Sequence, residues 1–547
     1  MNKNKIISAL LYTILLQFIA VTAIAENIKS FESIGIPPNE NTSGLDANIY
    51  KNAKRSQLTK LIKNLNPSGW HALDRTIHDL LTIEANTSLI ENDIQVAPNQ
   101  NLMMLRINTL LQTGQYQTAL LLYNKIDVEL EHISPTLASL GILAMLFNQE
   151  KALACVEIKS FFQRFASISL WKELNAWCNL KLTDERKQQA IQTIAESQNT
   201  ILQSMITSHD YTFEYEPSVF STLSFMQRAL LVSEDRIKLS LTEPAQYDIP
   251  QDHIAALHSQ SQMHDRMKLF VHIKATEYQF ISAASLKESY KNIFQKKYKT
   301  APKSDLLKIT ALHQDLQGGL LKIRTSDNQK KINQAIHIAK SYGYAVLIPL
   351  IPALEKLTLG TELPLNAVEK ILPLFLIEKR PIPTKWFKGL KRINEQEPEN
   401  HLAQKLLLAT QLINKSLGQE ESAILDINTS KTSAKPNKSS IYAKNIIENI
   451  DKGRNNVKNL DYIYENGFDL SKNTGYKLPS YEVLIALNQS SKNQNISTTL
   501  LLASYVLEKE RRKKIYWGTL SKSILALSSV GLKHLSYGIL AQAILEE

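Results

Sequence analysis

Three alanines at almost constant spacing most strongly constrain the fold of the first half of this chain. Ala119, Ala154 and Ala190 are 35 and 36 residues apart, and each follows a short polar turn within a stretch of helical periodicity. Tetratricopeptide-type helix pairs recur about every 34 residues and need a small residue where two helices cross closely. The spacing therefore predicts a stack of paired helices.

The first of these units also carries the turn and aromatic residues of such a repeat. Gly114 stands at the expected turn, and Tyr116 and Tyr123 flank Ala119 on the second helix. In the next two units the turns are expected at Asn148-Gln149 and Thr183-Asp184. Ser134-Pro135 predicts the start of the middle unit, because serine caps helices and proline favours their first position.

The residues that break helices are scarce, which extends the helical prediction to the whole chain. Only 17 glycines and 18 prolines occur in 547 residues, and strand-like alternation is hard to find. Such a composition favours long helices and few tight turns. We expect an all-α protein, an extended helical-repeat solenoid with a C-terminal helical module.

Composition shifts divide the chain into six expected parts. A polar segment with Pro37-Pro38 leads into two short amphipathic helices, one with Leu58 and Ile62 and one with Leu73 and Ile77 on their apolar faces. Pro349 and Pro352 are expected to break an apolar stretch over 344–377. The expected parts are a signal peptide (1–25), a flexible lead-in (26–46), tetratricopeptide-like repeats (47–240), a second helical region (250–420), a low-complexity linker (421–440) and the C-terminal helical module (441–547).

The first twenty-five residues have the three parts of a secretory signal. Lys3 and Lys5 precede an apolar run, and Ala23-Ile24-Ala25 forms a small-x-small cleavage site. We expect cleavage after Ala25 and a periplasmic or secreted protein. The alternative is an uncleaved inner-membrane anchor, since the nineteen residues 6–24 are long enough to span a bilayer.

Basic residues are concentrated in one stretch of a chain whose net charge is +11. Residues 287–340 hold twelve lysines and arginines against four acids. In an exported protein the partner would be an anionic polymer or membrane surface of the envelope and not nucleic acid. The alternative is an ordinary solvated surface. The patch residues nominated are Lys291, Lys296, Lys297, Lys299, Lys303 and Lys308.

Cys155 and Cys178 are the only cysteines, and export makes a disulfide between them plausible. The midpoint between them is the expected turn at Ala166-Ser167, so two antiparallel helices would bring both cysteines to the same height. A bridge requires Cα atoms within about 7 Å. The alternative is two buried free thiols.

No motif predicts catalysis, a metal or a cofactor. His253, His258, His264 and His272 lie close in sequence, and His264 and His272 fall roughly on one helix face, but His253 and His258 are not four residues apart and no His-Glu-x-x-His pattern occurs. Nucleophile elbows, phosphate-binding loops and dinucleotide fingerprints are absent. One enzymatic alternative is an envelope hydrolase acting on peptidoglycan, with a helical superhelix before a catalytic C-terminal module. Its acid would come from Glu448, Glu465, Glu482, Glu508 or Glu510.

The layout resembles a family of secreted alphaproteobacterial helical-repeat proteins, some of which carry the label antifreeze glycopeptide polyprotein. The shared features are the two helices of Leu58–Leu81, the Gly114–Tyr123 repeat, the cysteines with Leu170-Trp171 and Trp177, and the helical tail Leu520–Leu545. The resemblance implies a secreted helical scaffold and carries over no catalytic residues.

Together these features predict an exported scaffold or protein-interaction protein. Stacked helix pairs present an extended surface that suits the binding of envelope proteins. A purely structural or assembly role is the remaining alternative.

Overall fold

The structure is a computed structural model that describes most of the chain after residue 30. The described ranges are 31–40, 43–95, 101–126, 133–182, 185–208, 210–240, 249–297, 304–319, 325–419, 438–453, 479–511 and 517–546. The expected signal segment, the turn Thr183-Asp184, Lys299, Lys303 and most of the expected linker lie outside these ranges.

Helices form almost all of the regular structure, so the prediction of an all-α protein is confirmed. Within the described ranges the exception is one parallel pair of two-residue strands, β1 (Phe213–Glu214) and β2 (Ile237–Lys238). No described helix is long and apolar enough to cross a membrane. The helices, with 3-10 helices marked η, are η1 (Pro38–Glu40), α2 (Arg55–Lys63), α3 (His71–Thr82), η2 (Thr87–Leu89), α4 (Leu102–Gln112), α5 (Tyr116–Asn124), α6 (Pro135–Phe147), α7 (Lys151–Phe165), α8 (Ser169–Asn179), α9 (Glu185–Ala195), α10 (Thr200–Thr207), α11 (Pro217–Thr222), α12 (Phe225–Ser233), α13 (Gln251–Leu257), α14 (Asp265–Glu277), α15 (Ala283–Lys297), α16 (Asp305–Gly319), α17 (Thr325–Tyr342), η6 (Tyr344–Leu350), α18 (Ile351–Leu354), α19 (Leu365–Glu378), α20 (Thr384–Gln396), α21 (His401–Ser416), α22 (Lys438–Asp451), α24 (Tyr481–Lys492), α25 (Ile496–Arg511), α26 (Trp517–Ser529) and α27 (Lys533–Glu546).

Local sequence signals predict several of these helices correctly. The two amphipathic helices appear as α2 and α3, and their periodic residues Leu58, Ile62, Leu73 and Ile77 are buried. The Ser134 side chain accepts a hydrogen bond from the backbone N–H of Leu137 and caps α6, which begins at Pro135 as expected. The apolar stretch 344–377 is interrupted by prolines and divides into η6, α18 and α19.

Many helices end in the same left-handed corner. At the α4–α5 corner Gly114 has a φ of 81°, and the N–H groups of Gly114 and Gln115 donate to the carbonyls of Leu111 and Leu110. This is the Schellman pattern, which usually requires glycine. The same pattern recurs at non-glycine residues with φ between 52° and 63°, namely Gln149, Asp235, Gln279, Lys379 and Gln494. Tight corners therefore form despite the scarcity of glycine.

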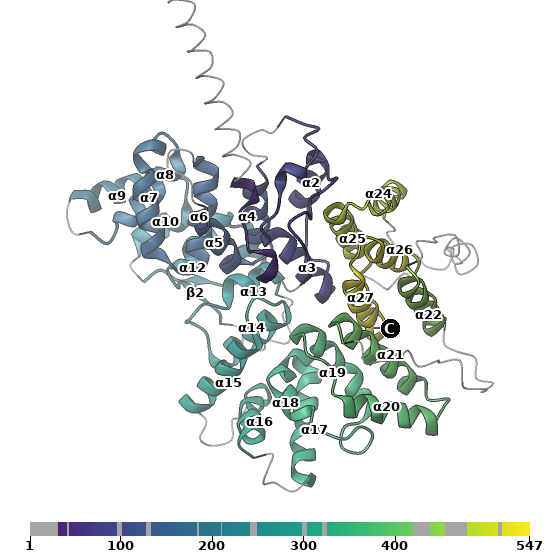
Figure 1. The fold of residues 1–547 in the computed structure, drawn as a ribbon. Helices are drawn as coiled ribbons and strands as arrows, with labels where there is room; N and C mark the ends of the chain where they lie inside the picture. Colours follow the sequence, from purple (N-terminus) through teal and green to yellow (C-terminus); the bar gives the residue numbers. More distant parts are fainter. Residues whose placement is uncertain are drawn as a thin grey trace, which may run out of the picture.

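Helices that follow one another in the chain pack side by side, from α4 through α10 and again from α12 through α17 (Figure 1). Further along, α19, α20, α21 and the C-terminal helices α22–α27 form the remaining layers. The last helices reach back to the first ones: α25 packs against α2 and α3, and α27 packs against α3 and α21.

Hydrogen bonds from a side chain and a close helix approach join the two ends of the described chain. Gln542 on α27 accepts a hydrogen bond from the backbone N–H of His71 (3.0 Å) and donates one to the carbonyl of Gly69 (3.2 Å). A Cβ atom on Gly538 would come within 3.0 Å of the Ala72 side chain, so glycine permits the close approach of α27 to α3. The helices therefore form a closed arrangement.

Two buried arginines fix residues 31–40 to the first helices. Arg106 is fully buried and donates hydrogen bonds to four backbone carbonyls, those of Glu32, Ile34, Leu81 and Ile83. Arg55 forms a two-pronged ion pair with the buried Glu32, at 2.7 and 2.9 Å. The polar composition of 26–46 gives no sign of these contacts.

Candidate functional site

The two cysteines lie at disulfide distance, as the sequence predicts. Their sulfurs are 2.04 Å apart and their Cα atoms 5.6 Å apart. Cys155 belongs to α7 and Cys178 to α8, and the chain turns between Phe165 and Ser169. The antiparallel pair of helices therefore brings them together as expected.

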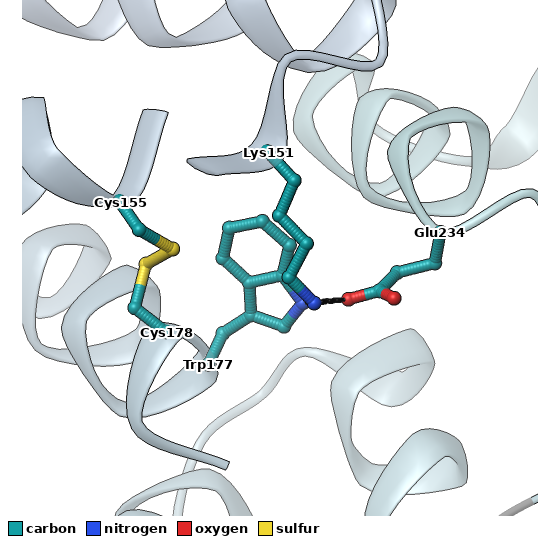
Figure 2. The surroundings of a disulfide bond; sticks show 5 residues. All are labelled: Lys151, Cys155, Trp177, Cys178 and Glu234. Atoms are coloured by element: carbon teal, nitrogen blue, oxygen red, sulfur yellow. Dashed lines mark hydrogen bonds and ion pairs between the residues drawn. A yellow bond between two sulfur atoms is a disulfide. The ribbon is translucent and has the colours of Figure 1, made fainter. Parts of the chain in front are cut away.

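A charged and aromatic cluster lies beside the disulfide (Figure 2). Lys151 forms an ion pair with Glu234, which also accepts a hydrogen bond from the Trp177 indole N–H at 3.0 Å. The Lys151 ammonium lies 4.5 Å from the centre of the Trp177 ring. Burial lowers the pKa of Lys151, although Glu234 opposes that shift. Because Glu234 caps α12, the cluster joins α7 and α8 to α12.

The residues predicted for repeat packing lie in helix contacts. Ala119, Ala154 and Ala190 are all buried. The ring of Tyr116 stacks on Phe147 with centroids 4.1 Å apart. A Cβ on Gly141 would overlap the Tyr123 ring, so that ring lies directly on the backbone of α6. These positions serve packing.

The four clustered histidines do not converge. His253 is buried, with its Nδ1 2.9 Å from the Tyr215 hydroxyl, and His272 donates from Nε2 to the carbonyl of His258 at 2.9 Å. Burial lowers the pKa of both His258 and His272 to about 4. His264 precedes α14 as its cap residue. Within the described part of the chain, no three His, Cys, Asp or Glu residues are arranged to hold a metal ion.

Three lysines of the basic stretch form ion pairs with its few acids. Lys291 pairs with Glu288, Lys308 with Asp305 at 2.7 Å, and Lys331 with Asp315 at 3.0 Å. The backbone of Lys296 and Lys297 belongs to α15, and their side chains lie outside the described set. These ion pairs reduce the charge that the stretch offers to a partner.

The described carboxylates nominated for an envelope hydrolase come from three different helices, α22, α24 and α25. Glu448 is exposed and pairs with Lys452, Glu482 is exposed at the start of α24, and Glu508 accepts a hydrogen bond from Asn66 at 3.3 Å. Glu465 and the side chain of Glu510 lie outside the described set.

A cavity of about 370 Å³ lies where α3 meets segments that are distant in sequence. Its walls come from α3, the corner between α4 and α5, the start of α13, the end of α14 and the corner after α19. Its volume is within the range of small-molecule sites. The polar lining residues are Asn66, His71, Asp74, Arg75, His78, Asp79, Thr113, Gln115, Gln251, Glu277, Tyr278, Gln279 and Lys379.

Each acid in the cavity wall already has a partner. Asp74 accepts hydrogen bonds from the Ser68 hydroxyl and from the backbone N–H groups of Ser68 and Gly69. Glu277 pairs with Lys274 at 2.8 Å. Asp79 accepts a hydrogen bond from Ser43 and lies 3.5 Å from the His78 Nδ1. Burial would raise the pKa of Asp79, but these contacts outweigh it and lower that pKa.

Arg75 retains donors after its structural bonds are made. Its Nη2 donates to the carbonyls of Leu376 and Ile377, both at 2.9 Å, which ties α3 to the end of α19. Its Nε and Nη1 have no hydrogen-bond partner among the residues that the structure describes. Burial lowers the pKa of Arg75 to about 10. Partial burial and the neighbouring Arg75 lower the pKa of Lys379, while Asp79 opposes that shift.

Three glutamines also line the cavity. Gln115, Gln251 and Gln279 are half-buried, and their side-chain amides make no hydrogen bond within the described ranges. An amide offers both a donor and an acceptor. The cavity wall thus carries two cations, three acids that already have partners, and neutral hydrogen-bonding groups.

Sequence reasoning did not identify this cavity. Its residues come from five segments between Leu65 and Lys379, and no local motif joins them. One weak signal was available, since Arg75, His78 and Asp79 lie on a helix already predicted to be amphipathic.

Comparisons with known proteins give no relative to assign. The chain matches no family model. No curated protein and no solved structure matches it either.

Proposed function

We propose that this protein is an exported helical scaffold of the bacterial cell envelope that binds other macromolecules and has no catalytic activity. In this proposal the helix pairs of 47–240 are tetratricopeptide-like repeats, and the protein docks on the anionic surface of a membrane. Export is supported by the signal-like Met1–Ala25 and by the cysteine pair at disulfide distance, since disulfides persist outside the cytoplasm.

The observation that carries the docking proposal is a row of cations on α20. Lys385, Lys388, Lys391 and Arg392 are all exposed, and none of them forms an ion pair or hydrogen bond with any described residue. Their spacing places them on one side of the helix. Trp386 and Leu390, on the other side, are fully buried, which fixes the direction in which the cations point.

The charges of α20 run against the dipole of the helix. Its first turn has no acid and contains Lys385, and its last turn has no base and contains Glu395. Acids favour the first turn and cations the last, by about 0.3–1 kcal/mol each. A surface arranged for stability would have the reverse order, so this order favours a role in binding.

An anionic membrane surface suits this row. Trp386 and Leu390 of α20 are buried in the protein core, so we expect docking to depend on charge and not on insertion. Lipid headgroups attract each nearby lysine or arginine by about 1 kcal/mol. Four such residues on one helix face would contribute about 4 kcal/mol, a millimolar-scale affinity.

The test is sedimentation of the chain lacking Met1–Ala25 with vesicles of phosphatidylcholine, alone or mixed with phosphatidylglycerol. We expect binding to the anionic vesicles only, and weaker binding as salt is raised. The variant Lys385→Glu/Lys388→Glu is expected to bind at least about 30-fold more weakly, because two attractive charges are lost. It should not be less stable, since it places acids near the start of α20.

The matched control is Lys172→Glu/Lys533→Glu, which changes the net charge equally. Both residues are exposed and lie near the starts of α8 and α27. Equal vesicle binding by the two double variants would contradict the role of α20. Binding to peptidoglycan sacculi without binding to vesicles would contradict the assignment of a membrane surface.

A further inference from the structure

The cavity beside α3 has features of a ligand site that the scaffold role does not require. It is lined by Arg75 and by Gln115, Gln251 and Gln279, whose amides have no hydrogen-bond partners among the described residues. Polar groups that converge on a small cavity are characteristic of sites for small molecules. This inference is independent of membrane docking, because α20 contributes no residue to the cavity.

We propose that this cavity binds a small neutral sugar. The hydroxyl groups of the sugar form hydrogen bonds with the three glutamine amides and with Arg75, and one face of its ring lies on the apolar part of the wall.

The charges of the wall favour an uncharged ligand. Asp79 and Glu378 both oppose the positive charge of Arg75, and Asp79 also opposes that of Lys379. The three acids of the wall are themselves held by hydrogen bonds or an ion pair. Because these charges already have partners, an ion would gain little attraction in the cavity and would still lose part of its hydration.

The polar groups left without partners in the described ranges suit hydroxyls. Each glutamine amide can donate and accept, and the Nε and Nη1 groups of Arg75 can donate. A hydroxyl also donates and accepts, so it can pair with any of them. Gln115 lies between α4 and α5, Gln251 at the start of α13, Gln279 after α14 and Arg75 on α3. A ligand that contacts all four segments needs polar groups around its whole body, as a sugar has.

Arg75 is oriented before any ligand enters. Its Nη2 group donates to the carbonyls of Leu376 and Ile377, both at 2.9 Å, which fixes the plane of the guanidinium. A hydroxyl that accepts from Nε or Nη1 would therefore immobilise little further side-chain freedom. A small loss of side-chain freedom lowers the cost of binding.

The apolar part of the wall suits the ring of a sugar. Ile77, Leu81 and Leu110 line the cavity, and all three are buried. Sites for small molecules combine an apolar wall with a few placed polar groups. A sugar ring is complementary to both, because its C–H groups form apolar patches between the hydroxyls.

Ligand-observed NMR titration of the full chain tests the proposal. The neutral probes are glucose and N-acetylglucosamine, which distinguish a plain sugar from one that also carries an amide. Glucuronate and glucosamine are the negatively and positively charged counterparts. We expect saturable binding of at least one neutral sugar, with a Kd below about 10 mM, and weaker binding of both charged sugars. Absence of saturable binding by both neutral sugars, or tighter binding of either charged sugar, would overturn the proposal.

Variants at two of the glutamines separate binding from folding. Gln279 has a φ of 63°, so Gln279→Gly removes the amide and also relieves a left-handed backbone. Gln251→Ala places a good helix former at the start of α13. We expect Gln251→Ala/Gln279→Gly to remain folded and to bind the sugar about tenfold or more weakly, as for two lost hydrogen bonds.

The matched control is Gln163→Ala/Gln494→Gly. Gln163 is exposed on α7, Gln494 has a φ of 54° between α24 and α25, and neither lines the cavity. Thermal unfolding of both double variants verifies that they are folded. If the two double variants bind the sugar equally well, the proposed site is wrong.

Discussion

Acidification from pH 7 to pH 5 should destabilise the region around His313 on α16. This side chain is buried, its ring meets the ring of Tyr290 edge-on at 5.6 Å, and neither ring nitrogen has a hydrogen-bond partner among the described residues. Burial lowers the pKa of His313 to about 4, with a smaller contribution from Lys287. The imidazole is therefore held neutral in the folded protein.

The size of the effect follows from the two pKa values. An unfolded histidine has a pKa of about 6.5. Because the folded pKa is lower, protonation favours the unfolded chain, and stability is full above about pH 6.5 and is lost as the pH falls toward 4. Proton linkage for this one group gives a loss of about 2 kcal/mol between pH 7 and pH 5.

The perturbation that isolates this residue is His313→Phe, which keeps the edge-on contact with Tyr290 and removes both nitrogens. The assay is hydrogen exchange of the α16 amides at both pH values, corrected for the intrinsic exchange rate. Between pH 7 and pH 5 the free energy of opening should decrease in both proteins. We expect the decrease to be about 2 kcal/mol smaller in His313→Phe than in the wild type. His258 and His272 titrate in the same direction, but they are present in both proteins and cancel.

The comparison of two pH values is needed because the variant also changes packing at neutral pH. Removal of unpaired buried nitrogens stabilises, while the larger ring introduces strain. Both effects are independent of pH. The exposed His401, replaced in His401→Gln, is the control. An identical pH dependence of α16 opening in the wild type and in His313→Phe would refute the reasoning.

Three further predictions concern stability. Titration of denatured, unreduced protein should find no free thiol. Cys155→Ala should lower the unfolding free energy by about 3 kcal/mol, because a loop between residues 23 apart is no longer closed, and chemical denaturation measures this change. Arg106→Met should leave four buried carbonyls without a donor and cost about 3 kcal/mol or more, with faster proteolysis of residues 31–40, whereas the exposed Lys60→Met should not. Gln279→Gly should raise the melting temperature through about 1 kcal/mol of relieved left-handed strain, and Gln279→Ala should not; equal melting temperatures would contradict this origin.

The features that could be predicted are local ones. The periodic residues of α2 and α3 mark a single helix face each, and Ser134-Pro135 specifies a helix start within four residues. Cys155 and Cys178 could be paired because their two antiparallel helices are joined by one short connection. In each case the deciding interaction lies within a short segment.

The features that were missed depend on partners far away in the chain. The corner at Gln149 lacks the glycine that marks such turns, and its amide bonds to the carbonyls of Val232 and Ser259, more than eighty residues away. The fixed orientation of Arg75 depends on Leu376 and Ile377. The spacing of Lys385, Lys388 and Lys391 is visible in the sequence, but their outward direction depends on the packing of Trp386, whose indole N–H donates to the carbonyl of Leu357 at 3.1 Å. None of these partners can be read from a local pattern.

The packing of α27 on α3 has a consequence for folding during synthesis of the protein. About 450 residues separate the end of α3 from the start of α27. At a typical synthesis rate the first helices wait about 20–90 s before the segment that covers them exists. The apolar faces of the first helices would bind chaperones or aggregate during that interval. A chain released before α27 is synthesised would leave the face of α3 that α27 covers exposed. Proteases would then recognise the truncated chain at its first helices.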